Sequence, residues 1–231
     1  MSLQLICFDL DDTFWEITAV IDAAEAELHS WLATQAPALG DDLPGSLERL
    51  RAQVIEQQPD LRHRISLLRH RVLVTALQQA GFDPHRAQQL ADAGFEVFIE
   101  ARHRVQLFPE VEDTLTALGQ DYHLAVLTNG NADVRRLGLG HHFDVILRAE
   151  DIGIAKPDPA PFNEILKRAG VDASEAVHIG DHPVDDISGA QGAGLKAVWF
   201  NPTGKAWSGQ GQPDAEISNL AQLPELLRTW R

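Results

Sequence analysis

The fold of this chain is indicated by one stretch near its start, Leu3-Gln4-Leu5-Ile6-Cys7-Phe8-Asp9-Leu10-Asp11-Asp12-Thr13. Its first part is a short, almost continuous apolar run, and that run stops at a cluster of aspartates. A buried strand has this pattern where it emerges at the edge of a sheet, because both of its faces are covered while its end meets solvent. We therefore predict a buried parallel strand whose carboxyl end carries acidic side chains.

Four later apolar runs of strand length also end at polar or turn residues. They cover residues 124–127, 143–147, 176–179 and 196–200, and a shorter strand is expected at 215–217. Helix-like segments lie between them at 110–118, 132–137, 160–169 and 185–193, and a last helix begins at Leu220. Strands that alternate with helices predict an α/β fold with a Rossmann-like parallel sheet, covered by helices on both faces.

Residues 14–104 have a different character. Ala, Leu, Gln, Arg and Glu dominate there, and apolar residues recur at helical spacing, as in Leu47, Leu50 and Val54. This pattern favours three or four helices and no strand. We therefore predict an α/β core made of residues 1–13 and 105–231, interrupted by an all-helical insert at 14–104.

The charge of the chain excludes some classes of partner. Its 231 residues include 34 acidic residues against 19 Lys and Arg, which gives a formal net charge of −15 at pH 7. Such a charge repels the phosphates of nucleic acids and anionic lipid surfaces, so we expect neither a nucleic acid polymer nor a membrane as partner. The predicted insert has a balance of −4 and the remaining residues −11. The acidic excess therefore belongs mainly to the α/β part.

Cysteine usage and the first residues bear on the compartment. Cys7 is the single cysteine, so no internal disulfide is possible, and its apolar surroundings predict an inert thiol. The first residues lack the basic segment of a signal peptide, and no apolar run approaches the roughly 20 residues of a membrane span. We expect a soluble, cytoplasmic protein, and the composition leaves monomer and homodimer open.

Polar residues follow the predicted strands at the edge where parallel α/β sheets bind their ligands. Carboxylates gathered at one edge repel one another unless a cation lies among them. Oxygen ligands of this kind suit a hard divalent ion such as Mg²⁺. The candidates at this edge are Asp9, Asp11, Asp12, Thr13, Thr128, Asn129, Gly130, Asp181, Asp185 and Asp186.

Lysine is rare in this chain, which makes its first occurrence informative. Only four lysines are present, and none precedes Lys156, in the loop Gly153-Ile154-Ala155-Lys156-Pro157-Asp158-Pro159. This loop follows the third apolar run of the predicted core. A cation there can lean into the acidic cluster, although a lysine in a loop can also be simply solvated.

These residues form four motifs in order along the chain: Asp9-Leu10-Asp11-Asp12-Thr13, Leu127-Thr128-Asn129-Gly130, Lys156 before a proline, and Gly180-Asp181-His182-Pro183-Val184-Asp185-Asp186. A lone Asp-x-Asp is common by chance in an acidic chain, but four motifs in register with strand ends are specific. The pattern resembles the haloacid dehalogenase (HAD) superfamily of phosphohydrolases over essentially the whole chain. The resemblance implies a HAD-like core, with the helical insert acting as a cap over the site.

The resemblance also implies a reaction. Asp9 would attack phosphorus as the nucleophile and form an aspartyl-phosphate. Asp11 would protonate the leaving oxygen and then deprotonate water in the second step. Mg²⁺ would be held by Asp9, the backbone carbonyl of Asp11 and Asp181, with Asp185 holding a metal-bound water.

The remaining motif residues would bind the phosphoryl group or support the metal. The Thr128 hydroxyl and the Asn129 backbone N–H would hold the transferring phosphoryl, and Lys156 would offset negative charge on Asp9 and the phosphate. The pair Asp185-Asp186 leaves the second acidic position ambiguous by one residue. Asp186 is also interpretable as an acid in the first turn of a helix.

Other activities of the superfamily can be weighed on single residues. The dehalogenase branch needs no metal and lacks an acid two residues after the nucleophile, so Asp11 argues against it. The phosphonate-cleaving branch uses a cap lysine, and the predicted insert contains none. A phosphatase and a sugar phosphomutase both use Asp9 and Asp11, so both stay open. The expected partner in either case is a small phosphorylated metabolite.

Finer details look most like one group within the superfamily. They include Phe14-Trp15 after the first motif, the run Thr128-Asn129-Gly130-Asn131, and Leu67-Leu68-Arg69 in the insert. These resemble bacterial phosphatases acting on flavin mononucleotide, the ribityl-aminouracil phosphate of riboflavin synthesis, and pyrimidine nucleotides.

Two non-enzymatic functions fit the motifs less well. A receiver-type signalling domain also phosphorylates an aspartate beside Mg²⁺, but its acceptor ends the third strand, and residues 43–65 are helical in character here. A catalytically dead HAD scaffold that serves as a binding module is disfavoured because every motif position is filled.

Two further residues are candidates for substrate binding. Arg62-His63-Arg64 recurs seven residues later as Arg69-His70-Arg71, which places both along one helix stripe. Arg69 could grip the distal part of an anionic substrate, or the stripe could be a solvated face paired with Glu residues. Trp15 could stack on a planar leaving group, or pack as an aromatic residue in the hinge.

Overall fold

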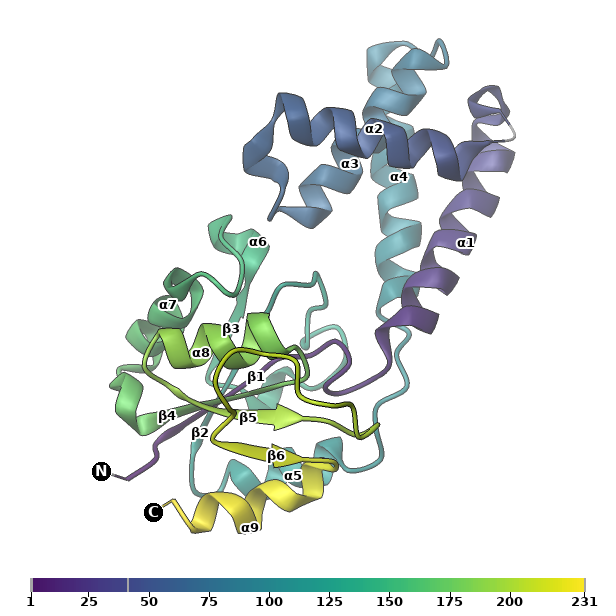
Figure 1. Ribbon diagram of the computed structural model, residues 1–231. Coiled ribbons are helices and arrows are strands. Elements are labelled where there is room, and N and C mark those ends of the chain that lie inside the picture. Colours follow the sequence, from purple (N-terminus) through teal and green to yellow (C-terminus); the bar gives the residue numbers. More distant parts are fainter. Residues whose placement is uncertain (1, 41, 231) are drawn as a thin grey trace. The chain divides into compact units, whose positions relative to one another are not determined.

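A six-stranded parallel sheet forms the centre of the larger unit (Figure 1). The computed structural model describes residues 2–40 and 42–230. The strands lie in the order β3-β2-β1-β4-β5-β6, and every neighbouring pair is parallel. Their bounds are β1 Leu5–Phe8, β2 His123–Thr128, β3 Val145–Arg148, β4 Ala176–Gly180, β5 Lys196–Phe200 and β6 Ala215–Ile217.

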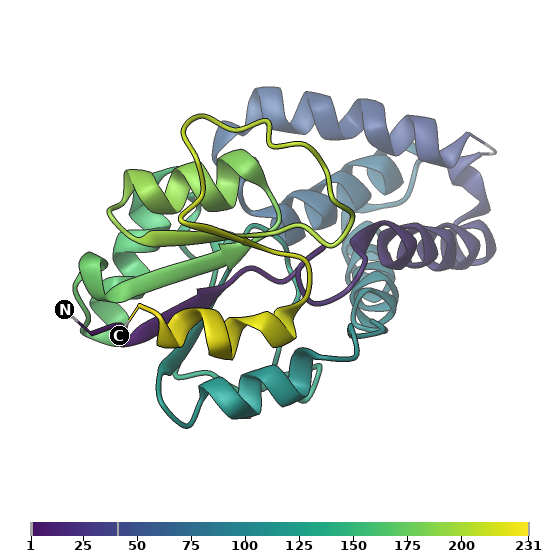
Figure 2. The same cartoon turned by 60° about the horizontal axis from the view of Figure 1, so that its bottom comes forward.

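Helices cover both faces of this sheet, which confirms the predicted fold class. On one face lie α5 (Val111–Leu118) and α9 (Leu223–Arg228), and on the other α7 (Pro159–Ala169) and α8 (Gly189–Gly192), as Figure 2 shows from a second direction. The short helix α6 (Ala149–Ile152) follows β3. Aliphatic side chains of the strands pack against α7 in a continuous apolar core. Within residues 2–40 and 42–230, no helix combines the length and apolar character that crossing a membrane requires.

Two segments of this unit differ from the sequence prediction. Residues 132–137 form a turn instead of a helix, because Asp133 accepts a hydrogen bond from the backbone N–H of Arg135 and Gly138 adopts a positive φ of 79°. A side chain that bonds its own backbone competes with a helix. The segment predicted as a helix at 185–193 begins as one π-helical stretch, Pro183–Ser188, before α8.

The smaller unit is entirely helical in its described residues. It consists of α1 (Ile17–Gln35), α2 (Leu43–Gln57), α3 (Ile65–Gln79) and α4 (Pro84–Arg102), with short 3-10 turns at Pro37–Leu39 and Pro59–Leu61. Helix α1 packs along α4, α3 packs on α4, and α2 packs on α3. Their apolar faces enclose a separate core that includes Leu28, Leu73 and Phe98.

The two units divide after Glu16 and after Val105. The predicted boundaries were Thr13 and Arg104, so the first lies later than expected. The reason is the packing of Phe14 and Trp15, which are both fully buried. The Phe14 ring lies 5.4 Å from that of Phe8 and 6.5 Å from that of Phe143, so it belongs to the α/β core.

Candidate active site

The carboxyl ends of β1 and β4 meet at the centre of the sheet. Strand β1 pairs with β2 on one side and β4 on the other, so the chain connections change direction between β1 and β4. Ligands of open α/β sheets bind at such a switch point. Asp9 follows β1 directly, its backbone N–H donates to the Ile179 carbonyl at 2.9 Å, and Asp181 follows β4. Thr128 ends β2 beside them.

A buried lysine joins two aspartates at this point. The Lys156 Nζ donates to Asp9 Oδ1 at 2.7 Å and to Asp186 Oδ1 at 2.6 Å. The three residues are 4%, 7% and 1% exposed, so their charges are largely removed from water. Lys156 therefore lies among the acidic side chains, as expected, and is not a solvent-exposed lysine of the loop.

The charges of this trio follow from burial and mutual attraction. Burial raises the pKa of the Asp9 carboxyl well above its ordinary value, and the Lys156 ammonium opposes that effect. Burial acts in the same direction on Asp186, but Lys156 and His178 outweigh it and hold the pKa of Asp186 below its ordinary value. Burial would lower the pKa of Lys156, whereas Asp186 and Asp9 raise it. One ammonium thus faces two carboxyl groups, and the charge of Asp186 also raises the pKa of Asp9.

Asp186 is held by donors on both of its oxygens. Its Oδ1 accepts from Lys156 and contacts His178 Nε2 at 2.9 Å, while Oδ2 accepts from the backbone N–H of His182 at 2.9 Å. His178 is fully buried on β4, and burial lowers its pKa, so the neutral ring donates from Nε2. These contacts fix the carboxylate that orients Lys156.

Gly180 provides the space that Asp186 occupies. A Cβ at Gly180 would lie 2.2 Å from Asp186 Cγ and 2.4 Å from its Oδ2, which no real side chain tolerates. His178 and Gly180 stand two residues apart on β4 and so face the same side of the sheet. Glycine at the end of this strand is therefore a steric requirement for the buried carboxylate.

The sequence predicted Asp185 at the metal site and Asp186 outside it, and the structure has the reverse. The structure groups Asp186, not Asp185, with Asp9 and Asp181. The Asp185 side chain is 35% exposed, and its Oδ2 accepts from the Asn129 Nδ2 at 3.3 Å. Neighbouring residues of a helical turn point in different directions, so a shift of one position moves a carboxylate out of the cluster.

Asn129 connects the second and third motifs through its side chain. Its Oδ1 accepts from the Lys156 backbone N–H at 2.9 Å, and its Nδ2 donates to the Lys156 carbonyl at 3.0 Å. These two bonds hold the lysine loop in place, a function that the sequence did not reveal. The Thr128 Oγ1 accepts from the Gly130 N–H at 2.9 Å, which leaves its own hydrogen to donate.

Trp15 differs from the stacking residue considered in the sequence. It is fully buried, so it presents no open face to a planar ligand, and the packed alternative describes it. Its indole N–H donates to Asp11 Oδ1 at 3.0 Å. The tight turn between these residues includes Asp12 at a φ of 59°, a left-handed conformation that aspartate tolerates better than most residues.

The donor set fits a hard divalent cation. Carboxylate oxygens of Asp9, Asp181 and Asp186 lie within 4.8 Å of one another, the one such group found in the described part of the chain. Burial, followed by the negative charges of Asp186 and Asp12, raises the pKa of Asp181 to about 6. The Trp199 indole donates to the Asp181 carbonyl at 2.8 Å and so fixes this residue. All side-chain donors are oxygens, as Mg²⁺ prefers.

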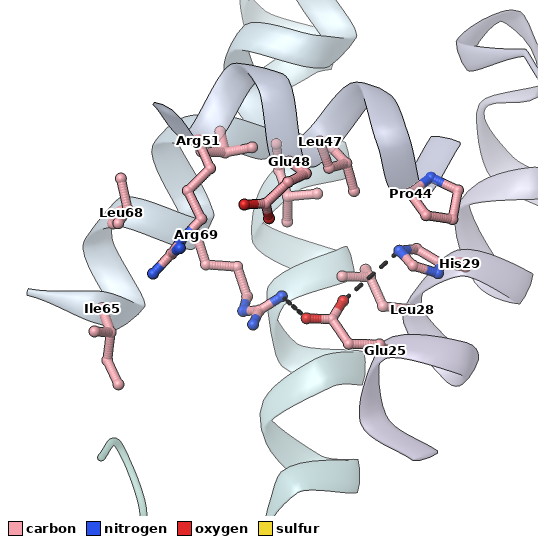
Figure 3. A pocket seen from close by; sticks show the side chains of 12 residues that line it. Glu25, Leu28, His29, Pro44, Leu47, Glu48, Arg51, Ile65, Leu68 and Arg69 are labelled. Carbon is pink, nitrogen blue, oxygen red and sulfur yellow. Dashed lines mark hydrogen bonds and ion pairs between the residues drawn. The ribbon is translucent and has the colours of Figure 1, made fainter. Parts of the chain in front are cut away.

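The helical unit contains a cavity of its own, of about 490 Å³ (Figure 3). Arg69 lines it, but its Nη1 already donates to Glu25 Oε1 at 2.7 Å and its guanidinium lies 3.6 Å from the centre of the Phe98 ring. Glu25 in turn lies 3.6 Å from His29. The remaining lining residues are Leu28, Pro44, Leu47, Glu48, Arg51, Ile65, Leu68, Val72 and Leu73.

Several supports of the site were not singled out from the sequence. They are His178, Gly180 in its steric role, Trp199, and Trp15 as a donor to Asp11. One signal was available for the first two. A histidine and a glycine two residues apart in a buried apolar strand, followed by aspartates, indicate a polar contact on one face of that strand.

Comparisons with known proteins agree with these residues. A family model for haloacid dehalogenase-like hydrolases matches residues 3–194. The 5-amino-6-(5-phospho-D-ribitylamino)uracil phosphatase YigB of Escherichia coli is 32% identical over 229 residues, which cover 97% of this chain and 96% of that protein. A phosphoserine phosphatase of Thermus thermophilus is 38% identical over 161 residues, 67% of this chain and 63% of the relative.

One solved structure is very similar in its fold. The crystal structure of a protein titled 2-haloacid dehalogenase, from Pseudomonas syringae pv. Tomato DC3000, has a TM-score of 0.97 and 57% sequence identity. The match covers 99% of this chain and all of that one. The relatives therefore carry two different reaction names, a phosphatase and a dehalogenase, on one architecture.

Proposed function

The chain belongs to the haloacid dehalogenase-like hydrolase family, and we propose that within this family it is a Mg²⁺-dependent phosphatase of a small phosphomonoester. The observation that supports this most is the cluster at the β1–β4 switch point, where carboxylate oxygens of Asp9, Asp181 and Asp186 lie within 4.8 Å of one another and a buried lysine bonds to Asp9 and Asp186. The carboxyl groups of this cluster repel one another without a cation, and a bound divalent cation would relieve that repulsion. The phosphatase relatives point in the same direction.

Leaving-group chemistry separates the two reaction names. A halide leaves as a weak base and needs neither a proton nor a metal. An alkoxide leaves as a strong base, so its departure is assisted by a proton donor. Asp11 lies two residues beyond Asp9 and offers a carboxyl group in this position.

The resident groups divide the work of phosphoryl transfer. Asp9 attacks phosphorus, and the electron pair of the bond to the leaving oxygen moves onto that oxygen, which takes a proton from Asp11. The aspartyl-phosphate is then hydrolysed by a water whose proton returns to Asp11, so the enzyme is restored. Lys156 offsets negative charge next to Asp9, and the Thr128 hydroxyl and Asn129 backbone N–H bind phosphoryl oxygens.

Asp9, Asp181 and the Asp11 carbonyl would hold Mg²⁺, with Asp186 supporting them through Lys156. When bound, the cation supplies charge neutralisation between the carboxylates and an anionic substrate, which otherwise repel. The ribityl-aminouracil phosphate, flavin mononucleotide and pyrimidine nucleotides are the substrates we propose to test first. We also propose that the protein acts in the cytoplasm.

The test is a hydrolysis screen over phosphorylated metabolites, measuring released phosphate with Mg²⁺ and with EDTA. We expect release that requires Mg²⁺ and is lost in Asp9→Asn, by a factor on the order of 10³ or more. A parallel measurement follows halide release from 2-chloropropionate. Halide release without phosphate release, or equal phosphate release by wild type and Asp9→Asn, would overturn the proposal.

A further inference from the structure

Trp15 and Asp11 form a short structural unit of their own. The indole N–H of Trp15 donates to Asp11 Oδ1 at 3.0 Å, and the two residues also form a β-bridge. The Trp15 side chain is fully buried, and the Phe14 ring meets it edge-on at 6.4 Å. A buried indole that is packed in this way cannot change rotamer freely, so its N–H is a fixed donor.

A fixed donor makes the two oxygens of the Asp11 carboxyl unequal. In a neutral carboxylic acid the carbonyl oxygen is the better hydrogen-bond acceptor, and the other oxygen carries the proton. An N–H held against Oδ1 therefore favours the form in which Oδ2 is protonated. The tryptophan thus selects which oxygen has a proton to give, as well as limiting the rotation of the carboxyl group.

We propose that Trp15 is a positioning residue for acid–base catalysis by Asp11. This inference rests on the proposed function, because it assigns a helper to the acid of that reaction. As the bond from phosphorus to the leaving oxygen breaks, its electron pair goes to that oxygen, which takes the proton from Asp11 Oδ2. In the second step the water oxygen bonds to phosphorus while the bond from phosphorus to the Asp9 oxygen breaks, and its electron pair returns to the Asp9 carboxylate. The proton of the water goes to Asp11 Oδ2, so Asp9 and Asp11 both return to their first state.

Leaving-group dependence tests this role better than a single rate does. An alkyl phosphate leaves as a strongly basic alkoxide and needs the proton, whereas p-nitrophenyl phosphate leaves as a weakly basic phenolate and needs it little. We expect Trp15→Phe to lower kcat/KM for an alkyl phosphate by about 10- to 100-fold, and for p-nitrophenyl phosphate by less than about threefold. A merely structural role would lower both by the same factor.

Packing must be separated from hydrogen bonding. Replacing Trp15 by 3-benzothienylalanine keeps the bicyclic shape and removes only the N–H, so it should reproduce the same unequal loss if Trp15→Phe folds poorly. The matched control is Trp207→Phe. The Trp207 indole donates to the Gly211 carbonyl at 2.9 Å, so its loss should leave the ratio of the two kcat/KM values unchanged.

Asp11→Asn distinguishes this inference from the function on which it rests. If Asp11→Asn loses activity on the alkyl phosphate while both Trp15 variants lower the two substrates equally, or not at all, the positioning role is wrong and the phosphatase reaction stands. If Asp11→Asn itself leaves both substrates unaffected, the acid assigned to the reaction is wrong. An unequal loss in both Trp15 variants and in Asp11→Asn supports the inference.

Discussion

The α/β unit and the helical unit treat charge in opposite ways. In the α/β unit Asp9, Lys156, Asp186 and His178 are buried and bonded to one another across distant parts of the sequence. In the helical unit the pair Arg49–Asp42 lies at the surface, and the pair Arg69–Glu25 lines an open cavity with 26% and 31% of the side chains exposed. Removing one partner of a buried ion pair destabilises a protein strongly, whereas removing one partner of an exposed pair has a small effect on stability.

This difference suggests a division of labour. A change in the buried cluster should reduce turnover of every substrate, because it alters groups that act on phosphorus. A change in the helical cavity should alter the affinity for particular substrates and spare turnover. Variants in the two units should therefore separate effects on turnover from effects on substrate affinity.

Gly180→Ala should have the largest effect. Its Cβ would overlap Asp186, which has packing on every side, so the carboxylate must move and Lys156 with it. We expect a loss of kcat on the order of 10³-fold or more with any substrate, and destabilisation of about 1–3 kcal/mol in urea unfolding. Gly192→Ala is the control, since a Cβ there meets nothing within 4 Å. Normal activity of Gly180→Ala would show that the cluster tolerates displacement.

The neighbouring aspartates should differ sharply. Asp186→Asn leaves Lys156 with one carboxylate and breaks a buried charge pair, so we expect kcat to fall by about 10²- to 10³-fold. Asp185→Asn keeps an oxygen that can accept from Asn129, and we expect less than about a fivefold loss. Steady-state kinetics at saturating Mg²⁺ measure both. A reversed order would restore the assignment first made from the sequence.

Mg²⁺ should stabilise the protein in a pH-dependent way. The pKa of Asp181 is raised to about 6 in the metal-free protein, so above that pH its carboxylate is free to bind the ion and below it a proton competes. The rise in Tm caused by Mg²⁺ should therefore be full at pH 7.5 and shrink as the pH falls through about 6. Differential scanning fluorimetry with and without EDTA measures it. A rise that is equal at pH 5 and pH 7.5 contradicts a role for Asp181.

Arg69→Ala should have the smallest effect on turnover. We expect KM for the preferred metabolite to increase up to about tenfold while kcat changes little, and KM for p-nitrophenyl phosphate to stay near its wild-type value. Loss of the ion pair with Glu25 and the contact with Phe98 should also cost about 1 kcal/mol of stability. Arg71→Ala, an exposed residue of the same helix, is the control. Equal KM changes for both substrates would leave Arg69 with a structural role only.

The sequence predicted the residues whose position follows from the backbone. Asp9 and Thr128 end their strands, and Asp181 follows one, so a correct reading of the strands places all three at one edge. Lys156 could be assigned because lysine is rare in this chain and the other motifs were in place. These assignments needed chain order and strand ends, and both can be read from apolar runs.

What the sequence did not predict depends on side-chain direction. Whether Asp185 or Asp186 enters the cluster is set by how the π-helical segment begins, and periodicity fixes helix ends poorly. The contact of Trp15 with Asp11 requires the tight turn around Asp12. That turn was not predicted, because the sequence does not reveal a positive φ at a residue other than glycine. In the helical unit no motif marks the cavity, because a lining of common residues has no signature.

The position of β1 in the middle of the sheet also constrains how the chain reaches its folded form. Leu5 pairs with His123 and Ala176, so both neighbours of this strand follow the helical unit in the chain. During synthesis β1 has no neighbouring strand to pair with until β2 has been made. Helix pairs such as α2 and α3, in contrast, can form from contacts that are close in sequence. A nascent chain that ends before β4 lacks Asp181 and Asp186, so it holds Asp9 and Lys156 without the other two carboxyl groups of the cluster. Asp9 is therefore translated first, and the cluster around it is completed last.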